Sequence, residues 1–366
     1  MAKYRVAVVG GAGTWGRYYM RAYAEHPDCE IIALVDQAKD RRQAFADRYG
    51  AQAVYDSIEE SLDREVPDIV SAIVPVGQNR PVVLACAEAG VRVVSCEKPL
   101  AVQLSDADEM VRVCRERGTL FACGQSRWIT PYMSEAIDWV HAGHIGRLTA
   151  ATIPGGLPEE VSGGGCVQLS ALRILSGMDV AWVEGYTLPP LPRYVAYPDG
   201  PEVEKDCPAY GRLGLTGDII CDIPAPSRDK EDRPSAFIAI EGEEGQVFLS
   251  SPQPVLLQGT GALRSPVFPE FLQQPPAVNA MFNGRIESLM HAFDTGEEPP
   301  SSGADYRHCL EVAMALVRSA ADGNRRIELP FADRSLRLFP ALYREKGGDV
   351  AGWESIGYAG PPNLPQ

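Results

Sequence analysis

The chain has 366 residues, which is long enough for two domains that each bury a core of their own. Its formal net charge of -15 at pH 7 argues against nucleic acid or an anionic membrane surface as a partner. No apolar run approaches the roughly 20 residues that cross a bilayer, and the start of the chain lacks a signal-peptide pattern, so we expect a cytoplasmic protein without a membrane partner.

The stretch Val6–Gly16 organises the first part of the chain. Residues 6–9 are apolar and predict a strand buried on both faces. Gly11, Gly13 and Gly16 follow with the spacing G-x-G-x-x-G, and a helix is expected over 17–24. In this pattern the glycines allow a tight turn, close approach of a pyrophosphate and close packing of the helix. We therefore expect the loop, Thr14 and Trp15 included, to bind the phosphates of a dinucleotide at the helix start.

A second apolar run, 31–35, ends in Asp36, close to the expected distance of about 20 residues after the glycines. A carboxylate there accepts hydrogen bonds from ribose hydroxyls and repels a 2′-phosphate, which favours NAD over NADP. Arg41 and Arg42 follow closely and would attract a 2′-phosphate. The alternative is that the glycines form an ordinary tight turn and Asp36 is a solvated loop acid.

Strands and helices continue to alternate through the first third of the chain. Strands are predicted at 52–55, 68–74, 91–95 and 119–123, and helices at 38–49, 58–63, 81–89 and 105–117. Such alternation is typical of a parallel, doubly wound sheet. We expect residues 1–123 to form a Rossmann dinucleotide-binding domain.

The pattern changes after residue 123. Strands are predicted at 148–153, 180–188, 212–223, 236–241, 246–250 and 254–258, and helices at 132–141, 279–293 and 306–321. Consecutive strands with flanking helices favour an α+β domain with a large open sheet, mostly antiparallel or mixed, over 124–330. The stretch 189–210 is rich in proline and charge and is expected to be a long loop at the site. Residues 331–366 lack periodicity and are expected to be a tail over the surface of the same or a neighbouring subunit.

With Glu97-Lys98-Pro99-Leu100, the chain resembles the Gfo/Idh/MocA family, which includes glucose–fructose oxidoreductase and inositol dehydrogenase. The resemblance extends over nearly all of the chain, through the glycine triplet, Asp36, Gly124-Gln125-Ser126-Arg127 with Pro131, Ile145-Gly146, Gly242–Gly245 and Thr295–Pro299. It implies a Rossmann domain, and a second domain whose open sheet often forms the interface of a homodimer or homotetramer. It also implies reversible hydride transfer between a nicotinamide and a hydroxyl carbon of a small carbohydrate-like substrate.

Lys98 is the main catalytic candidate. It directly follows a strand of the parallel sheet, at the edge where such sheets bind ligands. An ammonium there donates to the reacting oxygen, and with a lowered pKa it takes the proton. A surface lysine in a turn is the alternative. For the cofactor the resemblance also points to Pro75, Asn79, Glu97 and Arg127.

The expected catalytic pair of the second domain is missing. Many members of the family carry D-x-G-x-H-x-x-D on the first helix of that domain, where the histidine is the general base. Here the stretch 163–177 places Val167 or Leu172 at the histidine and Gln168 or Ser170 at an aspartate, depending on the alignment. Gln168 is therefore the second catalytic candidate.

Other polar residues near this stretch have less specific roles. Gln168, Arg173 and Trp128 are candidates for substrate contact, and structural packing is the alternative for each. Glu159 and Glu160, in the loop before the glycines, either face the substrate or are solvated.

Histidine and cysteine provide no further site. His141 and His144 have a metal-like spacing, but they fall at a predicted helix end far from the expected cleft, so we predict no metal. His26, His291 and His308 are expected to be packing or surface residues. The nine cysteines include no C-x-x-C pair and are expected to be reduced core residues.

Three functions fit these patterns. The first is an NAD-dependent oxidoreductase acting on a sugar, inositol or related polyol, with Lys98 as acid and base. The second uses transient oxidation for a redox-neutral elimination, glycoside cleavage or epimerisation. The third is a non-catalytic dinucleotide-binding protein, because the histidine and aspartate are missing.

Overall fold

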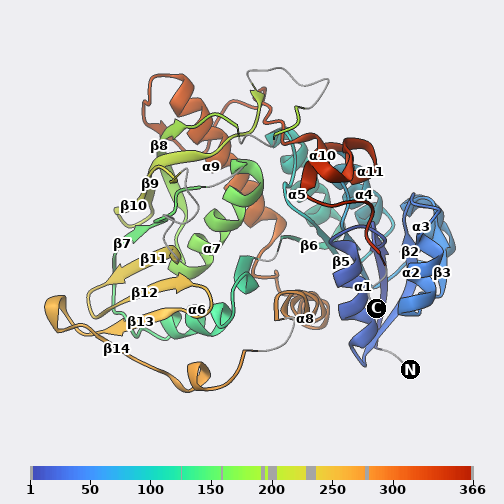
Figure 1. Cartoon of the computed structure of the whole chain (residues 1–366), viewed down its shortest axis with the longest axis horizontal. Coiled ribbons are helices and arrows are strands. Elements are labelled where there is room, and N and C mark those ends of the chain that lie inside the picture. The colour runs from blue at the N-terminus through green and yellow to red at the C-terminus, as the bar shows by residue number, and fades with distance from the viewer. Residues whose placement is uncertain are drawn as a thin grey trace.

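The computed structural model describes residues 3–124, 126–157, 160–190, 194–196, 204–227, 236–276 and 280–363. The chain forms two sheets, one of six strands and one of nine (Figure 1). This confirms the predicted combination of a parallel Rossmann sheet with a mixed sheet. Within the described residues, no helix is long and apolar enough to cross a membrane.

All strands of the first sheet run parallel, in the order β3-β2-β1-β4-β5-β6. The strands are β1 (Tyr4–Val9), β2 (Cys29–Val35), β3 (Ala53–Tyr55), β4 (Ile69–Ala72), β5 (Val93–Cys96) and β6 (Leu120–Cys123). The helices between them are α1 (Gly16–Glu25), α2 (Arg42–Tyr49), α3 (Ile58–Arg64), α4 (Val76–Glu88) and α5 (Leu104–Arg117). The strand order reverses between β1 and β4, which opens a crevice beyond the carboxyl ends of these strands.

The second sheet has the order β14-β13-β12-β11-β7-β10-β9-β8-β15, and only the β7–β10 pair among its described strands is parallel. Its strands are β7 (Leu148–Thr152), β8 (Val180–Thr187), β9 (Ala209–Leu215), β10 (Ile219–Ile223), β11 (Ala236–Gly242), β12 (Gly245–Ser250), β13 (Val255–Gln258), β14 (Ser265–Pro266) and β15 (Ile327–Glu328). The α-helices of this part are α6 (Met133–His141), α7 (Cys166–Ser176) and α9 (Gly303–Ala321). Short turns of helix lie at Ser126–Trp128, Val161–Gly165, Gly261–Leu263 and Glu270–Gln273. Helices α7 and α9 lie between this sheet and the first one (Figure 1).

Helix α8 (Ala280–Thr295) joins the core of the first sheet, although it follows the strands of the second. Phe282, Ile286 and Leu289 pack in one cluster with Tyr19 and Met20 of α1. The chain thus returns to the first sheet after building the second. The division at residue 123 stays a prediction.

The end of the chain is more ordered than its composition indicates. It forms α10 (Leu342–Lys346), α11 (Gly348–Ala351) and a 3-10 turn at Trp353–Ile356. Helix α10 lies beside α4 (Figure 1). The segment therefore borders the crevice of the first sheet. Of the predicted loop 189–210, residues 191–193 and 197–203 lie outside the described residues, and Ala209 and Tyr210 belong to β9 rather than to a loop.

Candidate active site

The loop between β1 and α1 is shaped by glycine. Gly10 has a φ of +77°, and a Cβ there would lie 2.1 Å from the carbonyl oxygen of Ile73. A Cβ at Gly16 would lie 2.0 Å from the carbonyl oxygen of Gly10, so α1 packs on the loop at a distance that only glycine allows. Gly11 is confined by core side chains at 2.5 Å, whereas Gly13 has its nearest neighbour at 3.2 Å.

The loop also carries polar groups that suit an anion. The hydroxyl oxygen of Thr14 is buried without a hydrogen-bond partner. Helix α1 has neither a side-chain cap nor an acidic residue in its first turn, so the positive end of its dipole is uncompensated. These features fit the pyrophosphate of a dinucleotide, with the exposed Trp15 at the rim.

Asp36 lies at the carboxyl end of β2, directly beside the loop. Its Oδ2 accepts a hydrogen bond from the Ala12 N–H at 2.9 Å, and its Oδ1 accepts one from the Ala38 N–H at 2.9 Å. Burial raises the pKa of the Asp36 carboxyl, while these two hydrogen bonds act in the opposite direction. Each carboxylate oxygen has a second lone pair, so both remain acceptors for ribose hydroxyls.

The backbone around Lys98 is fixed by hydrogen bonds from Asn79 of α4. The buried amide of Asn79 donates to the carbonyl oxygens of Glu97 at 2.9 Å, Pro99 at 2.9 Å and Leu100 at 3.2 Å. Asn79 is fully buried, so it positions the backbone of the Lys98 segment from the interior of the protein. Its predicted contact with the cofactor stays a prediction, as does that of Pro75, which directly precedes α4.

Two further contacts join this segment to the glycine loop. The Glu97 carboxylate accepts a hydrogen bond of 2.7 Å from the Tyr19 hydroxyl of α1. The Lys98 Nζ lies 5.9 Å from the ring centroid of Trp15, within range of a cation–π contact. The structure therefore brings Lys98 and the loop, which lie far apart in sequence, to one edge of the sheet.

Helix α8 supplies an aromatic wall beside these residues. Phe282 has its ring centroid 5.9 Å from that of Trp15. Two residues later a Cβ on Gly284 would lie 2.5 Å from the indole of Trp128, so that ring packs directly on the helix. Trp128 therefore has a packing role, and its predicted contact with substrate stays a prediction.

Helix α7, which packs on the second sheet, carries Gln168 and Arg173. The Gln168 Nε2 donates weakly to the carbonyl of Phe237 at 3.5 Å, and its Oε1 is buried without a hydrogen-bond partner. Arg173 is used differently, because its guanidinium pairs with Asp305 of α9 and with Asp179. The Gln168 Oε1 is thus a buried acceptor without a partner, and Arg173 links α7 to α9; the predicted contacts of both residues with substrate stay predictions.

Residues 4–125 match a family described as an oxidoreductase family with an NAD-binding Rossmann fold. D-apiose dehydrogenase of Paraburkholderia graminis is 25% identical to the chain over 87% of its length and 88% of that enzyme. Inositol 2-dehydrogenase of Rhizobium meliloti is 24% identical over 85% of this chain and 96% of that enzyme. The fold is shared with an NAD-binding oxidoreductase from Klebsiella pneumoniae, at a TM-score of 0.76, 19% identity and coverage of 91% of this chain and 100% of that one.

Residues 4–125 thus match the NAD-binding part of the Gfo/Idh/MocA oxidoreductases, and the longer matches are to relatives named as sugar and polyol dehydrogenases. The matched residues form the first sheet and its helices, which is the part that the family description calls an NAD-binding Rossmann fold. The resemblance read from the sequence is therefore confirmed.

The histidine that many family members use has no spatial substitute among the five histidines. His308 accepts a hydrogen bond from the Val180 N–H at 3.2 Å, and His144 stacks on Trp139 with ring centroids 4.9 Å apart. His26 accepts from the N–H of Asp28. His141 ends α6 and His291 pairs with Glu297 on the surface.

The guanidinium of Arg127 is directed at α6. It donates to the Ser134 hydroxyl at 3.0 Å and pairs with Asp138. Both partners lie on the helix that follows it, and neither belongs to the glycine loop. The cofactor contact that the resemblance implies for Arg127 is therefore unsupported by its partners and stays a prediction.

Sequence reasoning missed a buried polar cluster beside the start of α7. Glu160 accepts hydrogen bonds from the Ala341 N–H at 2.5 Å and from the Arg344 guanidinium. Asp206 accepts from the hydroxyl and N–H of Ser162 and is raised in pKa to about 7, by burial first and by the charge of Glu160 second. Arg344 lies 184 residues after Glu160, so no local sequence pattern predicts their contact. Glu159, predicted together with Glu160, lies outside the described residues.

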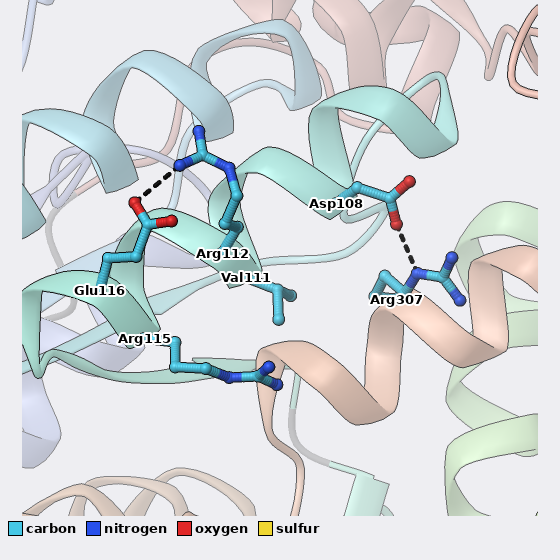
Figure 2. Close-up of a pocket in the computed structure, with 6 residues that line it drawn as sticks. All are labelled: Asp108, Val111, Arg112, Arg115, Glu116 and Arg307. Carbon is cyan, nitrogen blue, oxygen red and sulfur yellow. Dashed lines mark hydrogen bonds and ion pairs between the residues drawn. The ribbon is translucent and has the colours of Figure 1, made fainter.

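A separate hollow of about 300 Å³ lies between α5 and α9 (Figure 2). Within it Arg112 pairs with Glu116 at 2.7 Å and Asp108 pairs with Arg307 at 2.6 Å. Its lining contains no residue of the glycine loop or of the Lys98 segment. Since most of its charges are already paired, we assign the chemistry to the crevice of the first sheet.

Proposed function

We propose that the protein is an NAD-dependent oxidoreductase that transfers a hydride between the nicotinamide and a hydroxyl-bearing carbon of a sugar, inositol or related polyol. The observation that carries this proposal is the position of Lys98, held by Asn79 at the end of β5 and 5.9 Å from the ring of Trp15. Two relatives, D-apiose dehydrogenase and inositol 2-dehydrogenase, are named for polyhydroxylated substrates, which supports the substrate class.

The chain's own residues would divide the work as follows. Thr14 and the N–H groups at the start of α1 bind the pyrophosphate, and Asp36 accepts hydrogen bonds from the ribose. Bound nicotinamide supplies the hydride acceptor. Lys98 donates a hydrogen bond to the reacting hydroxyl oxygen and, in its neutral form, takes the proton from it. Gln168 accepts a hydrogen bond from a second hydroxyl and so orients the substrate.

Replacement of Lys98 tests this assignment. Lys98→Met should lower kcat/KM by about 10²- to 10⁴-fold, because the proton-transfer group is lost, whereas calorimetry should still detect NAD binding. Activity is measured as the change in nicotinamide absorbance with a panel of aldoses, inositols and sugar acids. Lys3→Met is the matched control, since Lys3 is exposed and directly precedes β1, at the opposite end of the parallel sheet.

Other results would contradict the proposal in distinguishable ways. Full activity of Lys98→Met would remove Lys98 from the mechanism. NAD binding without hydride exchange across the whole panel would indicate a binding protein. Turnover of a substrate without net change of the nicotinamide would indicate redox-neutral chemistry.

A further inference from the structure

The last part of the chain lies beside α4 at α10 and continues through α11 along the first sheet and its helices (Figure 1). It begins at Ala341 and Arg344, which bind Glu160. It then passes Pro75, whose ring would lie 3.4 Å from a Cβ on Gly347. We call residues 341–358 the C-terminal strap. It reaches the ribose end of the predicted site at α11.

Arg41 is the residue that the strap meets there. Its Nε donates to the carbonyl oxygen of Ala12 at 3.0 Å, and the N–H of the same Ala12 donates to Asp36. Arg41 and Asp36 therefore both bind the backbone of Ala12 in the glycine loop, Arg41 at its carbonyl oxygen and Asp36 at its N–H. The Arg41 side chain is only 13% exposed, and its Nη1 also lies 3.6 Å from the carboxylate of the exposed Asp40.

Asp349 of the strap pairs with this guanidinium in a fork. The Arg41 Nη2 lies 2.7 Å from Oδ2 of Asp349, and the Nη1 lies 3.3 Å from Oδ1. Trp353 donates from its indole N–H to Oδ1 of Asp349 at 3.0 Å and places its ring 5.6 Å from the Arg41 guanidinium carbon. A two-point ion pair with a stacked aromatic ring fixes the orientation of arginine more strongly than a single contact does.

The electrostatic consequence concerns the 2′-position of the adenosine ribose. Arg41 alone would attract the 2′-phosphate of NADP, while Asp36 repels it. With Asp349 present, the three side chains carry one net negative charge at this point. The charge of Asp349 also reaches Asp36, whose pKa it raises, although burial is the largest cause of that shift.

Resting on the proposed function, we propose that Asp349 selects NAD over NADP by cancelling the charge of Arg41 at the ribose end of the site. The neighbouring Arg42 is already occupied, because it pairs with Asp56 and donates to the carbonyl oxygen of Asp36 at 2.9 Å. Arg41 is thus the cation whose availability depends on the strap.

The experiment compares the affinities of full-length variants for NADH and NADPH by calorimetry. Asp349→Asn should improve the affinity for NADPH relative to NADH by roughly tenfold, because Arg41 gains a free guanidinium face. The double variant Asp349→Asn with Arg41→Ala should lose this gain. Asp349→Glu keeps the carboxylate and should keep the wild-type preference. Glu354→Gln is the matched control, since it removes one charge from the strap at an exposed position with no contact to Arg41.

The possible outcomes distinguish a failure of the inference about the strap from a failure of the proposed function. If Asp349→Asn changes the NADPH to NADH affinity ratio no more than Glu354→Gln does, the inference about the strap is wrong and the proposed function stands. If the gain persists without Arg41, the inference is also wrong. If the wild-type protein binds neither nucleotide, the proposed function fails together with it. Thermal unfolding of each variant identifies loss of fold, and Asp349→Glu then provides the deciding comparison.

Discussion

At the scale of single residues, the glycine loop shows what a sequence pattern can and cannot provide. The spacing of Gly11, Gly13 and Gly16 predicts a close approach of helix and strand, and the structure places a Cβ at Gly16 only 2.0 Å from a carbonyl oxygen. The spacing does not predict that Gly10 is needed as well, although Gly10 is the residue of the loop with a positive φ. The shape of the turn depends on backbone angles, and the glycine that needs an unusual angle here, Gly10, does not belong to the sequence motif.

We expect Gly16→Ala to destabilise the protein by about 2 kcal/mol, because the methyl group would overlap the Gly10 carbonyl and push α1 away from the loop. Urea unfolding measures the loss, and calorimetry should show weaker NAD binding. Gly155→Ala is the control, since a Cβ there meets open space. Equal stability of the two variants would contradict the packing described for α1.

The structure also gives the partners of two residues that the resemblance assigns to the cofactor. The resemblance points to Asn79 for the cofactor, and its hydrogen-bond partners, Glu97, Pro99 and Leu100, lie about twenty residues further on. Arg127 pairs with α6, and its cofactor contact stays a prediction. Residue type predicts that a group will form hydrogen bonds, whereas the direction depends on packing that a sequence does not contain.

At the scale of elements, strands were predicted better than helix starts. The buried strands of the first sheet are continuous apolar runs, and their positions agree with β1 to β6. Helix α4 begins at Val76, before the predicted start at Pro81, because a proline in the second turn costs one backbone hydrogen bond without preventing the helix. The two-residue strands β14 and β15 were missed, because two residues are too few to show an alternating pattern. Each is defined by its pairing with a neighbouring strand, β14 with β13 and β15 with β8.

The link between the strap and the start of α7 predicts a pH dependence of stability. The pKa of Asp206 is raised to about 7 in the folded protein, by burial and then by Glu160. The folded state therefore holds this proton more tightly than the unfolded state. The stabilisation is fully present below the unfolded pKa of about 4 and is lost as the pH rises through about 7.

Asp206→Asn should flatten the fall of Tm between about pH 4 and 7, because an amide does not ionise there. The measured quantity is the slope of Tm against pH, which remains informative even if the amide lowers stability at every pH. Asp63→Asn, at an exposed position on α3, should leave the wild-type slope unchanged. A wild-type slope in Asp206→Asn would show that this carboxyl titrates normally in the fold.

At the scale of the whole molecule, the helices of the described part of the chain leave one face of the second sheet uncovered. Strand register and alternation place Trp182, Tyr210 and Ile220 on the face opposite to α7 and α9, and all three are partly exposed. Tyr186, on the same face, is 43% exposed and stacks on Tyr210. The same face also carries the ion pair between Arg212 and Glu184, and exposed aromatic rings together with arginine are enriched at interfaces between subunits.

We expect the protein to be a homodimer or homotetramer through this face. Ile220→Asp should weaken the association more than tenfold, because a charge would be buried without a partner. Light scattering coupled to size-exclusion chromatography measures the mass of each variant. Leu263→Asp, at an 82% exposed position outside the sheet, is the control. A monomeric wild-type protein would contradict the expectation directly.

The return of α8 to the first sheet affects how the chain folds during synthesis. Tyr19, Met20 and their neighbours on α1 remain without their packing partners until Phe282, Ile286 and Leu289 have left the ribosome. The nucleotide-binding half, although encoded first, therefore completes its core only after the nine-stranded half has been translated. A gene fragment that ends with β6 would produce a sheet with an uncovered apolar flank.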